Sequence, residues 1–305
     1  MAIALQIESL HKTFQTGFIP KRKKILNGIS ICVDEGKIFG YLGPNGAGKT
    51  TTIKCILNLI SPDRGSINIL GFPHPSKKAR SRLGFLPENP YFYDYLTAGE
   101  FLDFYGRLFG LKKSIRKERA VRLLGEVGLE RARSVQLRKF SRGMLQRVGL
   151  AQALINDPSL VLLDEPLSGL DPIGRKEIRD IILALREKGK TVFLSSHILQ
   201  DLEMICDEVA MIVGGRIVSQ GKLRDLISEK ILFTEIIVSG VAAGELEKWG
   251  EDLIPQGGRT LIKVFDEDNV EAILDLVHKK QGKIYSLIPR TQNLEDFFFG
   301  TVEKQ

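Results

Sequence analysis

Short apolar runs alternate with longer amphipathic segments along the first two thirds of the chain. The runs FGYLGP, GSINIL, LVLLDE and TVFLSS, at residues 39–44, 65–70, 160–165 and 191–196, are each bounded by turn or polar residues. Such alternation is typical of a parallel β-sheet covered by helices. We therefore expect an α/β core in which these four runs are strands.

The block from about residue 87 to residue 158 has a different pattern, which reads as nearly all helix. It opens with the aromatic-rich segment PYFYDYLTAGEFLDFYGRLFG. Near its end, apolar residues recur at helical spacing from Met144 onward, and Asp157-Pro158 stops the pattern. Ser141 is a natural N-cap for this last helix. We expect a helical subdomain inserted into the α/β core.

The pattern changes again after about Gly221. Three strand-like runs, at 231–240, 260–265 and 283–289, alternate with helical segments at 243–250, 268–281 and 292–304. We therefore predict two domains, 1–225 and 226–305, the second a small α+β unit.

Composition narrows the class of protein. At 305 residues, 43% of them hydrophobic and 27% charged, the chain can form one large domain or two ordinary ones, with a sizeable core. It has no apolar run long enough to span a bilayer and no leader pattern at its N-terminus, so we expect a soluble cytosolic protein. The three cysteines and four histidines lack metal-ligand spacing, which argues against a disulfide framework or a zinc site.

The net charge of +7 is compatible with nucleic acid, a membrane surface or acidic ligands. One basic run, Lys21-Arg22-Lys23-Lys24, follows a glycine and a proline. We expect a solvated surface loop there, and contact with lipid headgroups or a phosphate is the less favoured alternative.

The stretch GPNGAGKT matches the phosphate-binding pattern G-x-x-x-x-G-K-[ST], with an apolar strand before it and a helix after it. The predicted nucleotide-binding residues are Gly43, Pro44, Asn45, Gly46, Ala47, Gly48, Lys49, Thr50 and Thr51. Glycines let the backbone curl so that successive N–H groups point at phosphate oxygens. Lys49 would reach the β- and γ-phosphates, and the Thr50 hydroxyl would coordinate Mg²⁺.

Two further apolar strands deliver polar groups at their ends. SLVLLDEP ends in adjacent carboxylates, of which Asp164 would hold Mg²⁺ and Glu165 would act as general base. TVFLSSH ends in His197, which we expect to contact the γ-phosphate, because parallel strands bring their carboxyl ends to one sheet edge. The guanine-reading N-K-x-D pattern is absent from the sequence.

The segment KFSRGM places Gly143 in the first turn of the last helix of the 87–158 block. Glycine lowers helix propensity there by about 1 kcal/mol relative to alanine, so an N-cap alone does not explain it. A helix N-terminus with bare N–H groups is a good place to hold an anion.

Over about residues 1–220 the chain resembles the nucleotide-binding subunit of an ATP-binding cassette (ABC) transporter. The resemblance rests on five motifs in a fixed order: the phosphate loop, FSRGM, LVLLDEP, SGLD and the histidine. The resemblance implies a P-loop NTPase core of the ABC ATPase type, with ATP and Mg²⁺ as cofactors. It also implies that two such domains close head to tail around two ATP molecules. Ser141, Arg142 and Gly143 would then grip the γ-phosphate of ATP held by the other subunit. Phe14 matches the residue that stacks on adenine, and Asp171 ends the loop that crosses the dimer interface.

Two positions depart from the family pattern. Glu88 stands where the family usually has glutamine, and its extra negative charge argues against direct metal contact. Met144 replaces a glutamine in the signature, but Ser141, Gly143 and the helix N-terminus are retained, so we expect a competent site.

The SRGM signature, Glu88 and the C-terminal unit are similar to the ABC-2-type exporter subgroup, in which this subunit pairs with a separate six-helix permease. The resemblance implies a second copy or a paralogous ATPase subunit as partner, and a place on the cytoplasmic face of the membrane. The aromatic patch at residues 91–95 either docks the permease or packs within the helical subdomain. The alternative is a soluble ABC ATPase acting on nucleic acid or ribosomes. Those relatives usually carry two cassettes or long insertions, which this chain lacks, so we expect no nucleic-acid partner.

Overall fold

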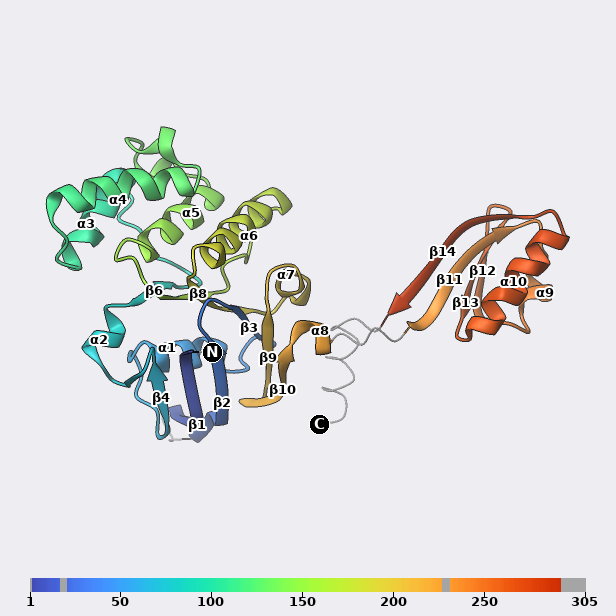
Figure 1. The fold of residues 1–305 in the computed structure, drawn as a ribbon, viewed down its shortest axis with the longest axis horizontal. Coiled ribbons are helices and arrows are strands. Elements are labelled where there is room, and N and C mark those ends of the chain that lie inside the picture. The colour runs from blue at the N-terminus through green and yellow to red at the C-terminus, as the bar shows by residue number, and fades with distance from the viewer. Residues whose placement is uncertain (1, 17–20, 227–230, 292–305) are drawn as a thin grey trace. The chain divides into compact units, whose positions relative to one another are not determined.

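The computed structural model describes residues 2–16, 21–226 and 231–291. The chain divides into two compact units, Met1–Leu223 and Arg224–Gln305 (Figure 1). Short helix α8 spans Leu223–Leu226. Each unit has its own hydrophobic core, and each is described separately below.

A six-stranded sheet forms the centre of the first unit, with strand order β10-β9-β3-β8-β7-β6. Its strands are β3 (Ile38–Leu42), β6 (Leu83–Leu86), β7 (Leu160–Asp164), β8 (Thr191–Ser196), β9 (Glu208–Val213) and β10 (Arg216–Lys222). All neighbours pair in parallel except β10, which pairs antiparallel with β9. Every residue of β3, β7 and β8 is buried, as expected for central strands covered on both faces. Three of the four predicted parallel strands are therefore confirmed.

The fourth run, GSINIL, belongs to a different sheet. It forms most of β4 (Arg64–Ile69), which pairs antiparallel with β1 (Ile3–Thr16) in a four-stranded sheet of order β2-β1-β4-β5. The other two strands are β2 (Lys21–Asp34) and β5 (Phe72–Pro73). The prediction of a parallel strand was wrong here. Only the second half of β4 is buried, unlike the central strands, and the length of an apolar run does not reveal its partner.

The two sheets of the first unit share one core with helix α1 (Lys49–Ile56). The Phe39 and Phe193 rings stack with centroids 5.6 Å apart, and the Tyr41 ring lies 5.4 Å from Phe193. Burial raises the pKa of the Tyr41 hydroxyl, whose oxygen lies 3.2 Å from Thr52 Oγ1 on α1. This packing fixes β3 and α1, and with them the loop that joins the two.

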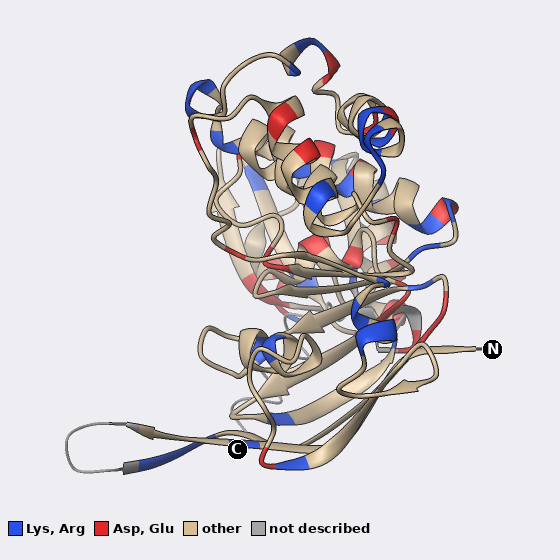
Figure 2. Ribbon diagram, turned by 90° about the vertical axis from the view of Figure 1, so that its left-hand side faces the viewer, with Lys and Arg blue, Asp and Glu red and all other residues tan. Residues whose placement is uncertain are grey.

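The basic run Lys21–Lys24 is not a loop, so that prediction was wrong. These residues begin β2, where they pair antiparallel with Thr13–Thr16 of β1. The side chains of Arg22, Lys23 and Lys24 are exposed. Figure 2 marks the positions of Lys and Arg residues along the ribbon in blue. Strand β2 is at the edge of its sheet. Charged side chains on an edge strand discourage pairing with another chain.

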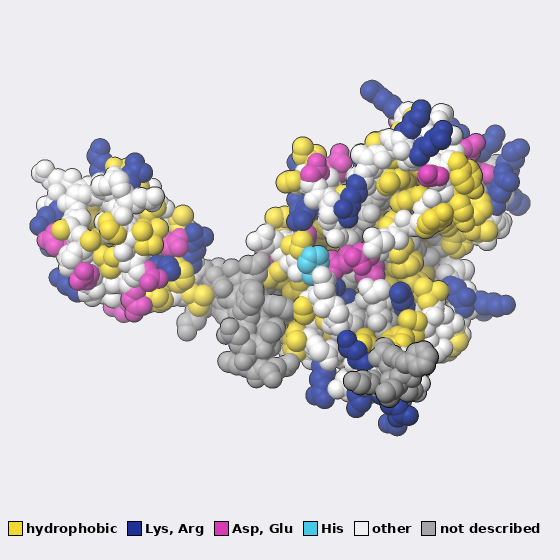
Figure 3. Space-filling model, turned by 180° about the vertical axis from the view of Figure 1, so that it is seen from behind, with side chains coloured by type: hydrophobic (Ala, Val, Ile, Leu, Met, Phe, Trp, Pro, Cys, Tyr) yellow, Lys and Arg dark blue, Asp and Glu magenta, His cyan; other side chains and the backbone are white. Residues whose placement is uncertain are grey.

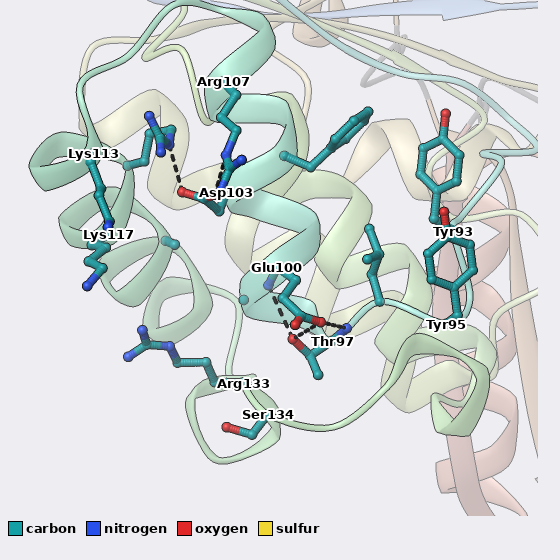
Figure 4. A pocket seen from close by; sticks show the side chains of 15 residues that line it. Tyr93, Tyr95, Thr97, Glu100, Asp103, Arg107, Lys113, Lys117, Arg133 and Ser134 are labelled. Carbon is teal, nitrogen blue, oxygen red and sulfur yellow. Dashed lines mark hydrogen bonds and ion pairs between the residues drawn. The ribbon is translucent and has the colours of Figure 1, made fainter.

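Between β6 and β7 the chain forms a helical subdomain, as predicted. Its helices are α3 (Ala98–Leu108), α4 (Lys113–Glu126) and α5 (Arg142–Ala153), with short 3₁₀ segments at Glu130–Ala132 and Leu137–Lys139. The helices contact one another (Figure 1). Asp103 on α3 bonds Arg116 on α4 at 2.6 Å and Arg107 at 2.7 Å (Figure 4). The bond from Arg116 is the main reason that the pKa of Asp103 is lowered, so the link between α3 and α4 persists at neutral pH.

Three more helices complete the first unit. They are α2 (Lys77–Arg80), α6 (Pro172–Glu187) and α7 (Leu199–Glu203). Helix α6 packs against β8, and Asp171 caps its N-terminus by accepting the Gly174 N–H at 2.8 Å. Across the part of the chain that the structure describes, no helix is both long and apolar enough to cross a bilayer.

The second unit is an antiparallel sheet of order β12-β13-β11-β14 with helix α10 (Glu267–Lys279) packed against it. Strands β11 (Ile231–Ser239), β13 (Arg259–Val264) and β14 (Lys283–Thr291) match the three predicted runs. Strand β12 (Glu251–Gln256) was missed because its side chains are nearly all exposed. Helix α9 (Ala243–Leu246) is shorter than predicted, and the predicted helix 292–304 lies outside the described residues.

Candidate nucleotide site

The carboxyl ends of β3, β7 and β8 meet at one edge of the six-stranded sheet. In the parallel register Leu42 lies beside Ser196, and Asp164 lies beside Ser195. The chain leaves β3 through residues 43–48 and enters α1 at Lys49. The side chains that follow these strands therefore lie close to the loop of residues 43–48.

The phosphate loop has a backbone that requires glycine. Gly46 has φ +81° and Gly48 has φ +116°, in the left-handed region that other residues avoid. A Cβ atom on Gly48 would also lie 2.8 Å from the Leu26 side chain. Helix α1 begins without a side-chain cap, so its first N–H groups are available to an anion.

Lys49 is a buried cation at the base of this loop, with only 6% of its side chain exposed. Its Nζ donates to the Gly43 carbonyl at 2.6 Å and to the Pro44 carbonyl at 3.3 Å. It also lies 3.1 Å from Glu165 Oε1. That contact is an ion pair without hydrogen-bond geometry, since Oε1 makes no hydrogen bond among the described residues.

Glu165 links the loop to the end of β8. Its Oε2 lies 2.8 Å from His197 Nδ1, while its Oε1 faces Lys49. The carboxylate is buried, whereas the imidazole is 37% exposed. Figure 3 shows a histidine beside acidic side chains on one face of the first unit. Glu165 has φ +50°, a strained conformation for a residue with a side chain.

Asp164 and Thr50 supply the oxygen atoms that a hard divalent cation prefers. Asp164 is 1% exposed, and its Oδ1 accepts a hydrogen bond from Ser195 Oγ at 2.6 Å. Thr50 is half-buried in the first turn of α1. Within the described ranges no group of three or more His, Cys, Asp or Glu residues gathers to hold a metal. Two oxygen donors suit Mg²⁺, which takes most of its ligands from phosphates and water.

The signature segment FSRGM, residues 140–144, makes contacts within its own chain. Ser141 is the N-cap of α5 and accepts the Met144 N–H at 3.3 Å. Arg142 Nη2 lies 3.3 Å from the Ser168 carbonyl. Its guanidinium fills the space where a Cβ on Gly169 would sit. Arg142 thus joins the signature to the 168–171 loop, a contact that the sequence did not reveal.

Other predicted residues lie in separate places. Asp171 is the N-cap of α6. Phe14 is half-buried near the end of β1, with Lys12 Nζ 5.5 Å from its ring centroid. Glu88 is exposed, two residues after β6. Their predicted roles in binding stay predictions.

Two polar residues near the site were missed by the sequence analysis. Ser195 bonds both Asp164 and the Glu165 N–H. Gln146 of α5 is buried and donates to the Pro166 carbonyl at 2.9 Å. Neither belongs to a motif that the sequence analysis used: Ser195 stands beside Ser196 at the end of an apolar run, and Gln146 stands beside Arg147 in an amphipathic helix.

A cavity of about 640 Å³ in the helical subdomain is a different feature. Tyr95, Asp103, Lys117 and Arg133 contribute to its lining (Figure 4). None of the phosphate-loop or strand-end residues lines it, so it is not part of the candidate nucleotide site.

Comparisons with known proteins identify relatives of this chain. The family model described as ABC transporter matches residues 26–168. An uncharacterized ABC transporter ATP-binding protein of Synechocystis sp. is 42% identical over 95% of this chain and 82% of its own. The Nod factor export ATP-binding protein I of Cupriavidus pinatubonensis is 36% identical over 90% of this chain and 85% of its own.

A dimeric ATP-binding cassette, solved in a post-hydrolysis state with ADP and Pi, is similar in structure. It has a TM-score of 0.65 and 25% identity over 72% of this chain and 99% of that chain. The strand order, the phosphate loop and the relatives point to the same conclusion. The chain belongs to the ABC transporter family as an ATP-binding, ATP-hydrolysing subunit.

Proposed function

We propose that this chain drives a separate export permease by binding ATP with Mg²⁺, closing as a dimer and reopening after hydrolysis. The observation that carries the proposal is the convergence of Lys49, Asp164, Glu165 and His197 at one sheet edge beside the phosphate loop. The relative named for Nod factor export supports the direction of transport.

In this proposal the loop and Lys49 bind the phosphates of ATP, with Phe14 against the adenine. Thr50 and Asp164 would hold Mg²⁺, which would neutralise phosphate charge when bound. Asp164 is 1% exposed and Lys49 is 6% exposed, so both charges lie in a water-poor place. Electrostatic interactions are stronger in such a water-poor site.

Glu165 is proposed to take a proton from the attacking water. Its carboxylate is fixed from two sides, by Lys49 and by His197. Phosphates that engage the Lys49 ammonium would compete with Glu165 for that charge. His197 would then keep the carboxylate oriented, and its exposed ring could reach the γ-phosphate.

The second half of each site is proposed to come from a partner subunit, either a second copy or a paralogue. Ser141, Arg142 and Gly143 would meet the partner's ATP, and Asp171 would lie at the interface. A Cβ on Gly143 would meet no atom of this chain within 4 Å. No contact within the chain therefore calls for glycine at this position, which fits a close approach from outside the chain, and the dimeric relative supports a dimer.

The helical subdomain is the proposed docking surface for the permease, which would hold the subunit on the cytoplasmic face of the membrane. Tyr91 is 80% exposed and Tyr95 is 62% exposed. Phe92 packs on Phe101, and Tyr93 packs on Phe104. Hydrophobic side chains gather over this region in Figure 3. An exposed apolar cluster of this kind favours a protein partner.

Affinity purification of the tagged chain from gently solubilised membranes of its host, followed by mass spectrometry, tests the proposal. We expect a multi-spanning membrane protein in stoichiometric amount. Ribosomal or DNA-bound proteins without such a partner would contradict it.

The double variant Tyr91→Ala/Tyr95→Ala is expected to lose most of the co-purified permease, because two exposed aromatic side chains are removed from the docking surface. The thermal unfolding midpoint should change little, since neither ring is buried. Met204→Ala is the matched control, because Met204 is an apolar side chain that is 62% exposed just after α7. Equal recovery of permease with the double variant would contradict docking at this surface.

A further inference from the structure

Ser195 is a fully buried hydroxyl at the catalytic edge of the sheet, in a strand that is otherwise mostly apolar. Its Oγ donates to Asp164 Oδ1 at 2.6 Å and accepts the Glu165 N–H at 3.0 Å. A serine hydroxyl has one proton to donate. One side chain therefore connects the carboxylate of Asp164 to the backbone of Glu165.

The register of the sheet accounts for this contact. Asp164 and Ser195 are neighbours in the parallel pair β7–β8, so their side chains lie on the same face of the sheet. The 2.6 Å distance is typical of a hydroxyl bonded to a charged carboxylate. It leaves Asp164 with its second oxygen and the remaining lone pairs for other ligands.

The bond from Glu165 has a separate effect. Glu165 has φ +50°, and a residue with a side chain keeps such a conformation only where its surroundings impose it. The Ser195 hydroxyl accepts the N–H of this strained residue. Its carboxylate points to Lys49 and His197 from that backbone.

We propose that Ser195 is a positioning residue for ATP hydrolysis, which orients Asp164 toward Mg²⁺ and fixes the backbone from which Glu165 acts. The inference rests on the proposed function of Asp164 and Glu165. Loss of the hydroxyl removes the hydrogen bonds that it makes with Asp164 Oδ1 and with the Glu165 N–H, and lost hydrogen bonds are costly in a buried place. Removal of such an outer hydrogen bond typically lowers metal affinity about 10- to 100-fold.

The test compares the full-length parent with Ser195→Ala, Ser195→Thr and Thr191→Val. Thr191 is the matched control: it lies at the other end of β8, is 2% exposed, and its Oγ1 accepts the Gly36 N–H at 2.9 Å. Thr191→Val thus also removes one buried hydroxyl from the same strand, but away from the site. Thermal unfolding midpoints report any general loss of stability in each variant.

The first readout is the affinity of the protein–AMPPNP complex for Mn²⁺, followed by electron paramagnetic resonance of the free ion. The nucleotide alone is titrated in the same buffer. AMPPNP binding is also measured in EDTA. The second readout is the split between kcat and KM in steady-state ATP hydrolysis.

We expect Ser195→Ala to raise the Mn²⁺ dissociation constant and lower kcat, each about 10-fold or more, with AMPPNP affinity in EDTA within twofold of the parent. Ser195→Thr should recover most of both values, because it restores the hydroxyl. Thr191→Val should bind Mn²⁺ as the parent does. If Ser195→Ala also binds Mn²⁺ like the parent, the inference is wrong. If the parent itself binds no AMPPNP, the proposed function fails instead.

Discussion

Replacing Glu165 with glutamine is expected to abolish ATP turnover while nucleotide binding persists. Glutamine has nearly the same shape but cannot take a proton from water, and a general base contributes roughly 10²- to 10⁴-fold to a rate. In the proposed site the phosphate loop and Lys49 would bind ATP without help from the Glu165 carboxylate. The Lys49 Nζ atom lies 3.1 Å from Glu165 Oε1, so the substitution also removes the ion pair that this ammonium group makes.

The measurement is steady-state phosphate release together with equilibrium binding of ATP at a temperature that suppresses turnover. Glu187→Gln, an exposed carboxylate at the end of α6, is the matched control and should hydrolyse ATP like the parent. A turnover rate of Glu165→Gln within threefold of the parent rate would contradict the assignment of Glu165 as the general base.

Replacing Gly143 with alanine is expected to stabilise the subunit and to impair it as an enzyme. Gly143 lies in the first turn of α5 and is not among the residues with positive φ. Nothing in the chain crowds a Cβ there, so the free energy of unfolding should rise by about 0.5–1 kcal/mol. In the proposed dimer the same methyl group stands between the helix N-terminus and the partner's phosphate, so turnover should fall at least about tenfold, by loss of electrostatic stabilisation.

Denaturant unfolding and ATP hydrolysis, measured on the same preparation, provide the test. Gly125→Ala is the matched control: Gly125 is in α4, and a Cβ on it would also meet no atom within 4 Å. It should raise stability by a similar amount at unchanged turnover. A Gly143→Ala variant that is both more stable and fully active would contradict the proposed contact with a partner's nucleotide.

The sequence predicted the central strands well, because β3, β7 and β8 are buried on both faces and read as continuous apolar runs. It could not assign β4 to the correct sheet, since an apolar run does not reveal whether its neighbour is parallel. The basic run at residues 21–24 was misread for a related reason. A preceding Gly and Pro suggest a turn, but strand pairing with β1 depends on tertiary structure.

The site was predictable as a set of motifs but not as a set of contacts. Spacing identifies Lys49, Asp164 and Glu165, yet the ion pair between Lys49 and Glu165 depends on the geometry of two separate loops. Ser195 meets Asp164 only because of the register of β7 and β8. Arg142 at the start of α5 contacts the Ser168 carbonyl of the 168–171 loop, which is distant from it in the sequence. Register and packing of this kind do not follow from motif spacing.

The buried hydrogen bond from Gln146 to the Pro166 carbonyl has a mechanical consequence. It fastens α5 to the residue directly after Glu165, so the helical subdomain and the end of β7 are connected by a short, stiff link. A displacement of α5 would be transmitted to that carbonyl through this single buried hydrogen bond. The position of the helical subdomain is in this way coupled to the backbone beside Glu165.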